Sequence, residues 1–116
     1  MDEVPTLEIG LADPASPTNL LPLAPDGVLT PGIDGFLAFR ARLTNVQALE
    51  SVILRTGSEK RESSTFRVLT LAPTAILTVS LQTKDFPDGT PIHVHVIARD
   101  LFGSEVEVYL EFVLAK

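Results

Sequence analysis

Two runs of alternating apolar and polar residues, joined by a short turn, constrain the fold of this 116-residue chain more than any other feature. In the first run every second residue is apolar, at Ile92, Val94, Val96 and Ala98. In the second run the same spacing gives Val106, Val108, Leu110, Phe112 and Leu114. Between them stands Asp100-Leu101-Phe102-Gly103, in which Asp and Gly are typical turn residues. The alternation predicts an antiparallel hairpin with one buried face and one solvent face.

Shorter alternating segments precede this hairpin at regular spacing. We predict strands over residues 36–44, 51–56, 66–71 and 76–82. Several short strands separated by turns are typical of an all-β sandwich. The inward positions are expected to form the core: Leu37, Phe39, Ala41, Leu43, Val52, Leu54, Leu77, Val79, Leu81, Ile92, Val94, Val96, Ala98, Val106, Val108, Leu110 and Phe112.

Two segments interrupt this regular pattern. Thr44 and Gln47 have the spacing of a helix capping box, which would allow one helical turn, although a loop agrees better with the strands on either side. Residues 57–65 form the most polar run of the chain, and we predict a solvated loop there.

The first 35 residues differ from the remainder because they contain six of the nine prolines. Proline lacks an amide donor, so we expect a proline-rich N-terminal arm over residues 1–35, with one edge strand at 6–11. The sandwich is then expected over residues 36–116. Two interpretations of the arm stay open: it closes the edge of the sandwich, or it docks on a neighbouring subunit.

The hairpin also carries a family resemblance. Phe86-Pro87-Asp88-Gly89, the alternating strand after it and Ala98-x-Asp100-x-x-Gly103 resemble the end of bacterial immunoglobulin-like and fibronectin-type-III-like domains. The resemblance covers roughly residues 36–114 and implies an immunoglobulin-like antiparallel β-sandwich of about seven strands. Ile92 stands where the family usually has an aromatic residue, so no tyrosine-corner hydrogen bond is expected there.

The same resemblance implies a role without catalysis. Domains of this kind serve as spacers or adhesive units of bacterial surface proteins, and phage structural proteins resemble them too. We therefore expect a structural or protein–protein interaction module. It is either a virion subunit (phage decoration or tail) or a domain of a cell-surface or secreted protein, and its partners are other protein subunits or further copies of itself.

The composition of the chain disfavours several other classes of function. The net charge is −6 and the basic residues are scattered, which disfavours nucleic acid as a partner. There is no cysteine and no run of about 18 apolar residues, so we expect neither a disulfide nor membrane insertion. The acidic start, Met1-Asp2-Glu3-Val4-Pro5, lacks the apolar region of a signal peptide. No cofactor is expected.

Side chains of the types that bind metals occur at two places. His93 and His95 fall on one face of their strand, and glutamates of the next strand are expected on that face: Glu105, Glu107 and Glu111. We predict that the histidines face solvent without a metal, since two ligands on a flat strand hold one poorly. Calcium is not expected either, because Asp13, Asp88 and Asp100 stand singly.

Partner binding is predicted at apolar residues outside the inward strand faces. Leu101 and Phe102 occupy the hairpin tip, and the arm carries Leu20, Leu21 and Leu23. The alternative for the tip is that it folds over the end of the sandwich together with Phe86. Large apolar side chains left in water usually mark a contact surface. We therefore predict these five residues to face partners, and the sandwich to fold without residues 1–24.

Overall fold

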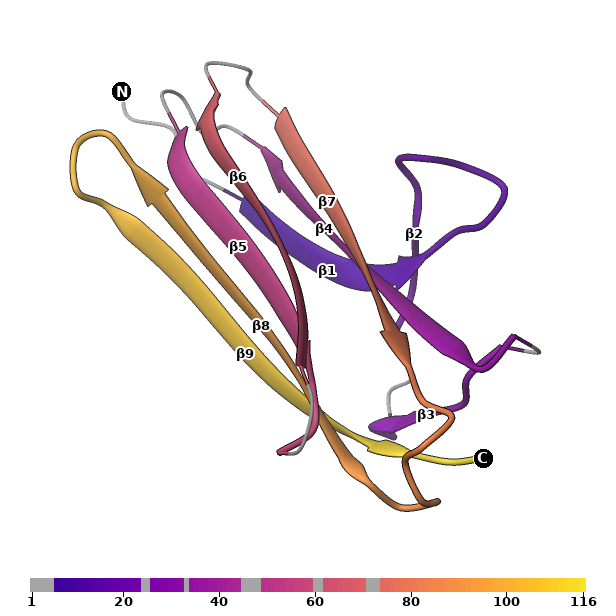
Figure 1. Ribbon diagram of the computed structural model, residues 1–116. Coiled ribbons are helices and arrows are strands. Elements are labelled where there is room, and N and C mark those ends of the chain that lie inside the picture. The colour runs from indigo at the N-terminus through magenta and orange to yellow at the C-terminus, as the bar shows by residue number, and fades with distance from the viewer. Residues whose placement is uncertain (1–5, 24–25, 33, 45–48, 60–61, 71–73) are drawn as a thin grey trace.

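Strands and loops make up the computed structural model, and residues 6–23, 26–32, 34–44, 49–59, 62–70 and 74–116, which it describes, contain no helix (Figure 1). One sheet has the strand order β2 (Leu20–Leu21), β1 (Thr6–Ala12), β4 (Phe36–Thr44), β7 (Thr74–Gln82). The other has the order β3 (Val28–Leu29), β9 (Glu105–Leu114), β8 (Pro91–Asp100), β5 (Leu49–Gly57), β6 (Glu62–Thr70). The fold is therefore an all-β sandwich of two sheets.

The predicted hairpin of β8 and β9 is confirmed, with its register. His95 lies opposite Tyr109, and Val94 lies opposite Leu110. The four apolar residues on the inward face of β8 are all buried. Since a shift by one residue would turn this whole face to solvent, burial of alternate residues fixes the pairing of the strand.

The core lies between the two sheets and contains most of the predicted residues. Phe39 of β4 stacks on Phe112 of β9 across it, with ring centroids 6.5 Å apart. The prediction is wrong for three residues of β9, which are only half-buried: Val106, Val108 and Leu110. They lie on a strand at the side of the sheet, where little of the opposite sheet covers them. The core also includes buried residues that were not predicted: Leu29, Ala75, Phe86 and Leu114.

The polar run at 57–65 is only partly a loop. β6 begins at Glu62 and pairs with β5, with Glu62 opposite Gly57 and Ser63 opposite Thr56. The prediction is wrong for Gly57, the last residue of β5, and for residues 62–65, which pair with β5 despite their polarity. Residues 45–48, with most of the capping-box segment, lie outside the described residues.

The proline-rich segment contributes strands to both sheets. β1 pairs with β4 along Thr6–Leu11, and its end also pairs with β2. β3 runs parallel to the last residues of β9. Because β2 crosses close to Gly10, a side chain at Gly10 would place its Cβ 2.5 Å from the carbonyl oxygen of Leu21. The nine strands of the described part therefore exceed the expected number of about seven, and two of them, β2 and β3, are only two residues long.

Candidate functional site

The tip of the β8–β9 hairpin is a rigid turn rather than a loose loop. The Asp100 side chain accepts hydrogen bonds from the backbone N–H groups of Phe102 and Ser104, both at 2.9 Å. The N–H of Gly103 donates to the carbonyl of Asp100, and Gly103 has a φ of 89°, which favours glycine. Asp100 thereby fixes the backbone that presents Leu101 and Phe102.

Both apolar side chains of this tip project into solvent. Phe102 is 84% exposed and Leu101 is 51% exposed. The expectation that they could fold over the core together with Phe86 is wrong. Phe86 is buried in the β7–β8 loop, at the end of the sandwich opposite the hairpin tip (Figure 1). The tip is therefore an exposed apolar surface on a fixed turn.

The three leucines of the arm have different surroundings. Leu23 is half-buried and packs against the core. Leu20 is half-buried in β2, whereas Leu21 is 41% exposed. The arm leucines therefore do not form one continuous exposed surface, and they lie apart from the hairpin tip, by β2 at the other side of the molecule in Figure 1.

The outer face of β8 carries a cluster of two histidines, one tyrosine and two glutamates. Tyr109 stacks on the His93 ring at a centroid distance of 6.0 Å and meets the His95 ring edge-on at 5.5 Å. His95 Nε2 lies 3.0 Å from Glu107 of β9. His93 Nε2 lies 2.8 Å from Glu62 of β6.

This cluster differs in detail from the sequence prediction. The sequence predicted glutamates of β9 on the face of the histidines, and Glu107 does contact His95. His93 instead contacts Glu62 of β6, a strand on the other side of β8. Tyr109 covers both rings, so the histidine side chains are only 21% and 22% exposed. Tyr109 was missed, although its position opposite His95 follows from the hairpin register.

Two pKa values near this face shift for identifiable reasons. Desolvation raises the pKa of the Tyr109 phenol, and the neighbouring Glu111 carboxylate raises it further, so Tyr109 stays protonated at neutral pH. The hydrogen bond and charge of Glu105 raise the pKa of Arg99, whose Nη2 lies 2.9 Å from the Glu105 carboxylate. Neither shift brings a group into the range where it would exchange protons at neutral pH.

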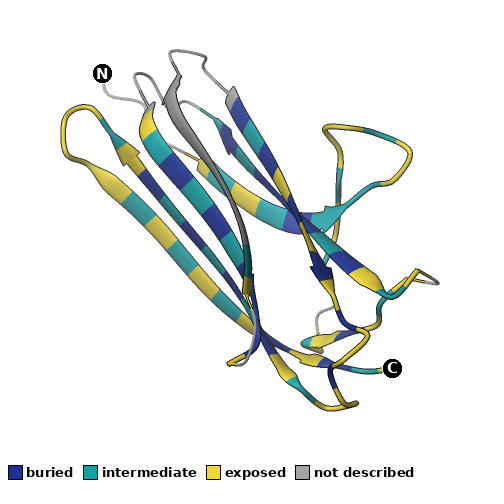
Figure 2. Cartoon of the chain, viewed as in Figure 1, coloured by how far each residue is buried: buried dark blue, intermediate teal, exposed yellow. Residues whose placement is uncertain are grey.

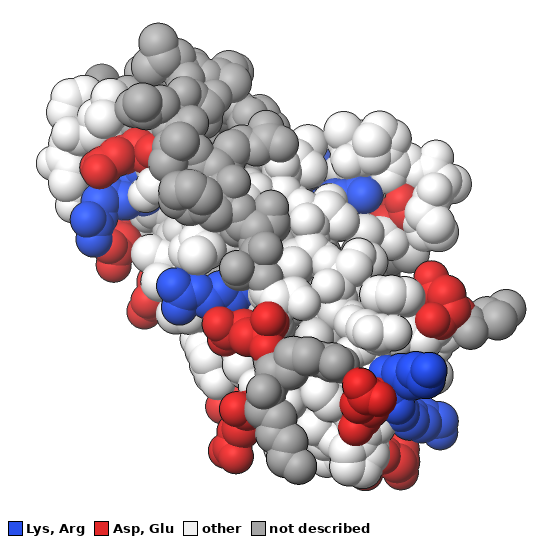
Figure 3. All heavy atoms as spheres, in the orientation of Figure 1, with Lys and Arg blue, Asp and Glu red and all other residues white. Residues whose placement is uncertain are grey.

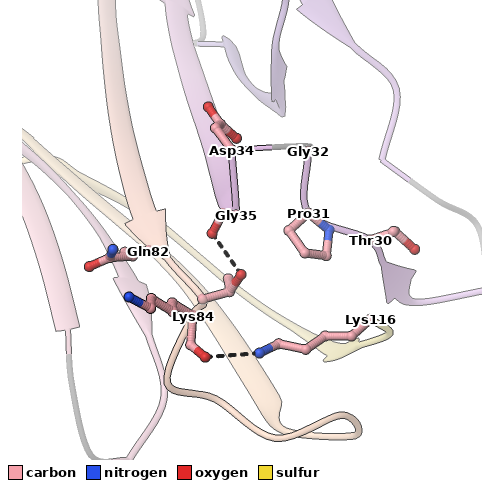
Figure 4. Close-up of a pocket in the computed structure, with 9 residues that line it drawn as sticks. Thr30, Pro31, Gly32, Asp34, Gly35, Gln82, Lys84 and Lys116 are labelled. Carbon is pink, nitrogen blue, oxygen red and sulfur yellow. Dashed lines mark hydrogen bonds between the residues drawn. The ribbon is translucent and has the colours of Figure 1, made fainter.

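A shallow recess of about 440 Å³ lies at the end of the sandwich near the C-terminal strand (Figure 4). Its floor is fixed by Thr83, whose N–H and hydroxyl both donate to the carbonyl of Gly35. Lys116 Nζ donates to the carbonyl oxygen of Lys84 at 3.1 Å. Three charged residues line the recess, and all three are exposed to solvent: Asp34, Lys84 and Lys116. The recess therefore does not enclose a ligand site.

Arg40 is a charged residue buried on the outer side of β4, only 6% exposed. Its Nε donates to the Thr78 hydroxyl, and its Nη1 donates to the carbonyl oxygens of Ser16 and Asn19 at 2.9 and 2.6 Å. The arginine therefore fastens the loop between β1 and β2 to the sheet. The sequence placed Arg40 on an outer face, but nothing in it indicated which loop would cover that face.

Charges of both signs occur on the face of the molecule drawn in Figure 3. On the face drawn in Figure 3, acidic and basic groups lie interspersed, and neither sign forms a continuous patch. Within the described ranges, no group of three or more metal-binding side chains comes together. No helix long and apolar enough to cross a membrane occurs there either.

Comparison with known family models, curated proteins and solved structures found no match to this chain.

Proposed function

We propose that this protein is a non-catalytic structural module with an immunoglobulin-like fold, acting as a small subunit of a large assembly such as a phage virion decoration or tail. The strand order supports the fold assignment. The seven longer strands, taken in chain order as A, B, C, C′, E, F and G, give the sheets A-B-E and G-F-C-C′. Two antiparallel sheets divided in this way support the immunoglobulin-like sandwich that the hairpin motif also resembles.

The observation that carries the functional proposal is the exposed tip at Leu101 and Phe102. A phenylalanine that is 84% exposed on a turn fixed by Asp100 loses little conformational entropy when a partner covers it. Aromatic anchors of this kind dominate the affinity of many interfaces. Leu21, exposed on β2, offers a second and smaller contact.

The proposal is tested by replacing Phe102. Phe102→Ser is expected to leave the thermal midpoint nearly unchanged, because the side chain packs on little of its own molecule. Loss of a central anchor costs about 2 kcal/mol or more in binding, about thirtyfold in Kd. The measurement is the amount of variant that co-purifies with the native assembly from cells producing both forms.

Val113→Ser is the matched control. Val113 is an exposed apolar residue of the same hairpin, 45% exposed, but lies beside β3 away from the tip. If Phe102→Ser enters the native assembly as well as Val113→Ser does, the hairpin tip is not a contact surface. Recovery of the native protein only as a 12.5 kDa monomer would contradict the assembly role itself.

The alternative function is that of an immunoglobulin-like spacer or adhesive domain in a bacterial surface or secreted protein. The direction of the strands favours it. β1 begins at the end of the sandwich where β4 finishes, with Thr6 opposite Thr44, and β9 finishes at the other end beside β3. A module 46 Å long that is entered at one end and left at the other suits a linear array of domains. The mass of the native polypeptide separates the two functions. A mass much larger than that of this chain would mean that it is joined to neighbouring domains.

A further inference from the structure

One side of the sandwich is less well closed than the other. At one side, β6 contacts β7 of the opposite sheet. At the other side lie β1 and β9, and within the described residues these two strands make at most isolated contacts with each other. Six apolar side chains on the inward faces of these two strands are half-buried: Leu7, Ile9, Leu11, Val106, Val108 and Leu110. Phe112 and Leu114, toward the end of β9, are buried. We call the six half-buried residues the open side.

The exposure along β9 follows from its position rather than from its sequence. Inward residues of the neighbouring β8 are fully buried, including Val94 and Val96, which lie opposite Leu110 and Val108. Figure 2 shows intermediate and exposed residues alternating along most of β9, where β8 alternates buried and intermediate ones. The inward face of β9 is thus only partly covered from Val106 to Leu110.

The backbone of β9 is also unpaired on its outer edge. Leu114 donates its N–H toward β8, to the carbonyl of Thr90, while Val113 donates in the opposite direction, to Gly27. Because successive residues of a strand point their N–H groups to opposite sides, the other odd-numbered residues point away from β8: Glu105, Glu107, Tyr109 and Glu111. In the described part only β3 pairs on that side, at Val113 and Leu114. We call the remaining four backbone positions the free edge.

The side chains around the free edge determine what could pair with it. Glu105, Glu107 and Glu111 are exposed on the outer face of β9. A strand added beside β9 would place its outward side chains next to these carboxylates and its inward side chains over Val106 and Val108. Opposite charges on neighbouring strands stabilise pairing, and like charges destabilise it.

A second copy of this chain does not satisfy these conditions. Antiparallel pairing of β9 with itself would put Glu105 against Glu111, or Glu107 against Glu107, depending on the register. Acidic residues along an edge strand are a common means of preventing such self-association. The occupant is therefore a different sequence, with basic residues where β9 has glutamates.

We propose that the free edge of β9 accepts an extended segment of a partner protein in which Lys or Arg alternates with apolar residues. This inference rests on the proposed function and names the chemistry of its partner. The added strand would pair with the backbone at the free edge, cover the open side and place basic side chains beside the glutamates, two of which also contact Arg99 and His95. This is recognition by strand addition.

The first experiment uses the unmodified protein and an eight-residue capped peptide of alternating Lys and Val. Amide hydrogen exchange is followed by NMR, residue by residue. At peptide concentrations ten times its Kd, exchange should slow about tenfold at the four amides of the free edge. The amides of Val106, Val108 and Leu110 are the internal reference, because β8 already protects them.

Two control peptides define the outcomes. A peptide of alternating Glu and Val should not protect the free edge, and neither should one with four Lys followed by four Val, which keeps the charge but not the alternation. Equal protection by the scrambled peptide, or no protection by the alternating one, would overturn the proposal. Protection that appears without peptide and grows with protein concentration would show that a second copy is the occupant instead.

The second experiment compares Glu107→Pro with Glu107→Ala. Both variants lose the carboxylate and its contact with His95, but only proline removes the outward N–H that an added strand would use. We expect Glu107→Pro to weaken peptide protection at the remaining free-edge amides about tenfold relative to Glu107→Ala, the loss of about one hydrogen bond. If Glu107→Pro fails to fold, the peptide titration of the unmodified protein still decides the matter.

These results can be separated from failure of the proposed function. If Glu107→Pro enters the native assembly at normal stoichiometry while Phe102→Ser does not, the strand-addition inference is wrong and the assembly role stands. If the peptide binds the free edge but the native protein is isolated without any partner, the assembly role fails instead.

Discussion

Thr56 lies on the inward face of β5, fully buried between the two sheets. Its hydroxyl oxygen has no hydrogen-bond partner in the described part of the chain. A buried hydroxyl that has given up its hydrogen bonds to water without replacing them costs about 1–3 kcal/mol. At the scale of single residues, Thr56 is thus a point where the native sequence is less stable than its fold allows.

Thr56→Val is therefore expected to raise the free energy of unfolding by about 1 kcal/mol, because valine has a similar shape and no unsatisfied group. Chemical denaturation of the purified protein measures this change. Thr78→Val is the matched control on the other sheet, where the hydroxyl accepts a hydrogen bond from Arg40, and it should lower stability. A lower midpoint for Thr56→Val would mean that the hydroxyl has a partner in solution.

At the scale of strands, β8 and β9 were predicted almost to the residue, whereas the short strands were not. Alternation in a long run determines both the strand and its buried face, and this pattern is present in residues 92–98. β2 and β3 have two residues each and exist because the neighbouring strands offer unpaired backbone. No local pattern encodes them, so they could not be found from the sequence.

Some features of the candidate site could be predicted from the sequence, and others could not. The sequence placed Leu101 and Phe102 in a turn, outside both strand faces, but left open whether they face a partner or fold over the end of the sandwich. The covering of Arg40 by the β1–β2 loop and the pairing of His93 with Glu62 join residues far apart in the chain. Such contacts depend on the strand order of the sheets, which local periodicity does not specify.

The register of β8 makes a direct prediction. Val94→Asp would place a charge without a partner between the sheets, and we expect the protein to lose several kcal/mol of stability or to unfold. Circular dichroism during heating measures this. His95→Gln, one residue away on the outer face, should change the midpoint little. A Val94→Asp protein that melts at the normal temperature would contradict the register.

At the scale of the whole molecule, the proline-rich segment is part of the sandwich's packing. β1 pairs with β4 over six residues, Thr6–Leu11. The side chains of Leu7, Ile9, Leu11 and Leu23 pack against the core. Removal of this segment would uncover one side of the core and leave the edge of β4 unpaired.

We therefore expect a chain lacking residues 1–24 to unfold or to melt at a much lower temperature than the intact chain, in place of the sequence-based expectation that it stays folded. Differential scanning calorimetry of both chains tests this. A Leu20→Ser, Leu21→Ser variant, which keeps β1, should melt close to the intact protein. Equal stability of the truncated and intact chains would show that β1 contributes nothing to folding.

β1 begins at one end of the sandwich and β9 finishes at the other, and this arrangement has a mechanical consequence. A pull applied at the start of β1 and the end of β9 acts along the strands, because Thr6 and Leu114 lie at opposite ends. The hydrogen bonds of β1 with β4 and of β3 with β9 would then be loaded together in shear, rather than opened one after another. Under tension the module would yield abruptly and as a unit, so in a strained particle or a stretched surface fibre it would bear load up to a threshold force.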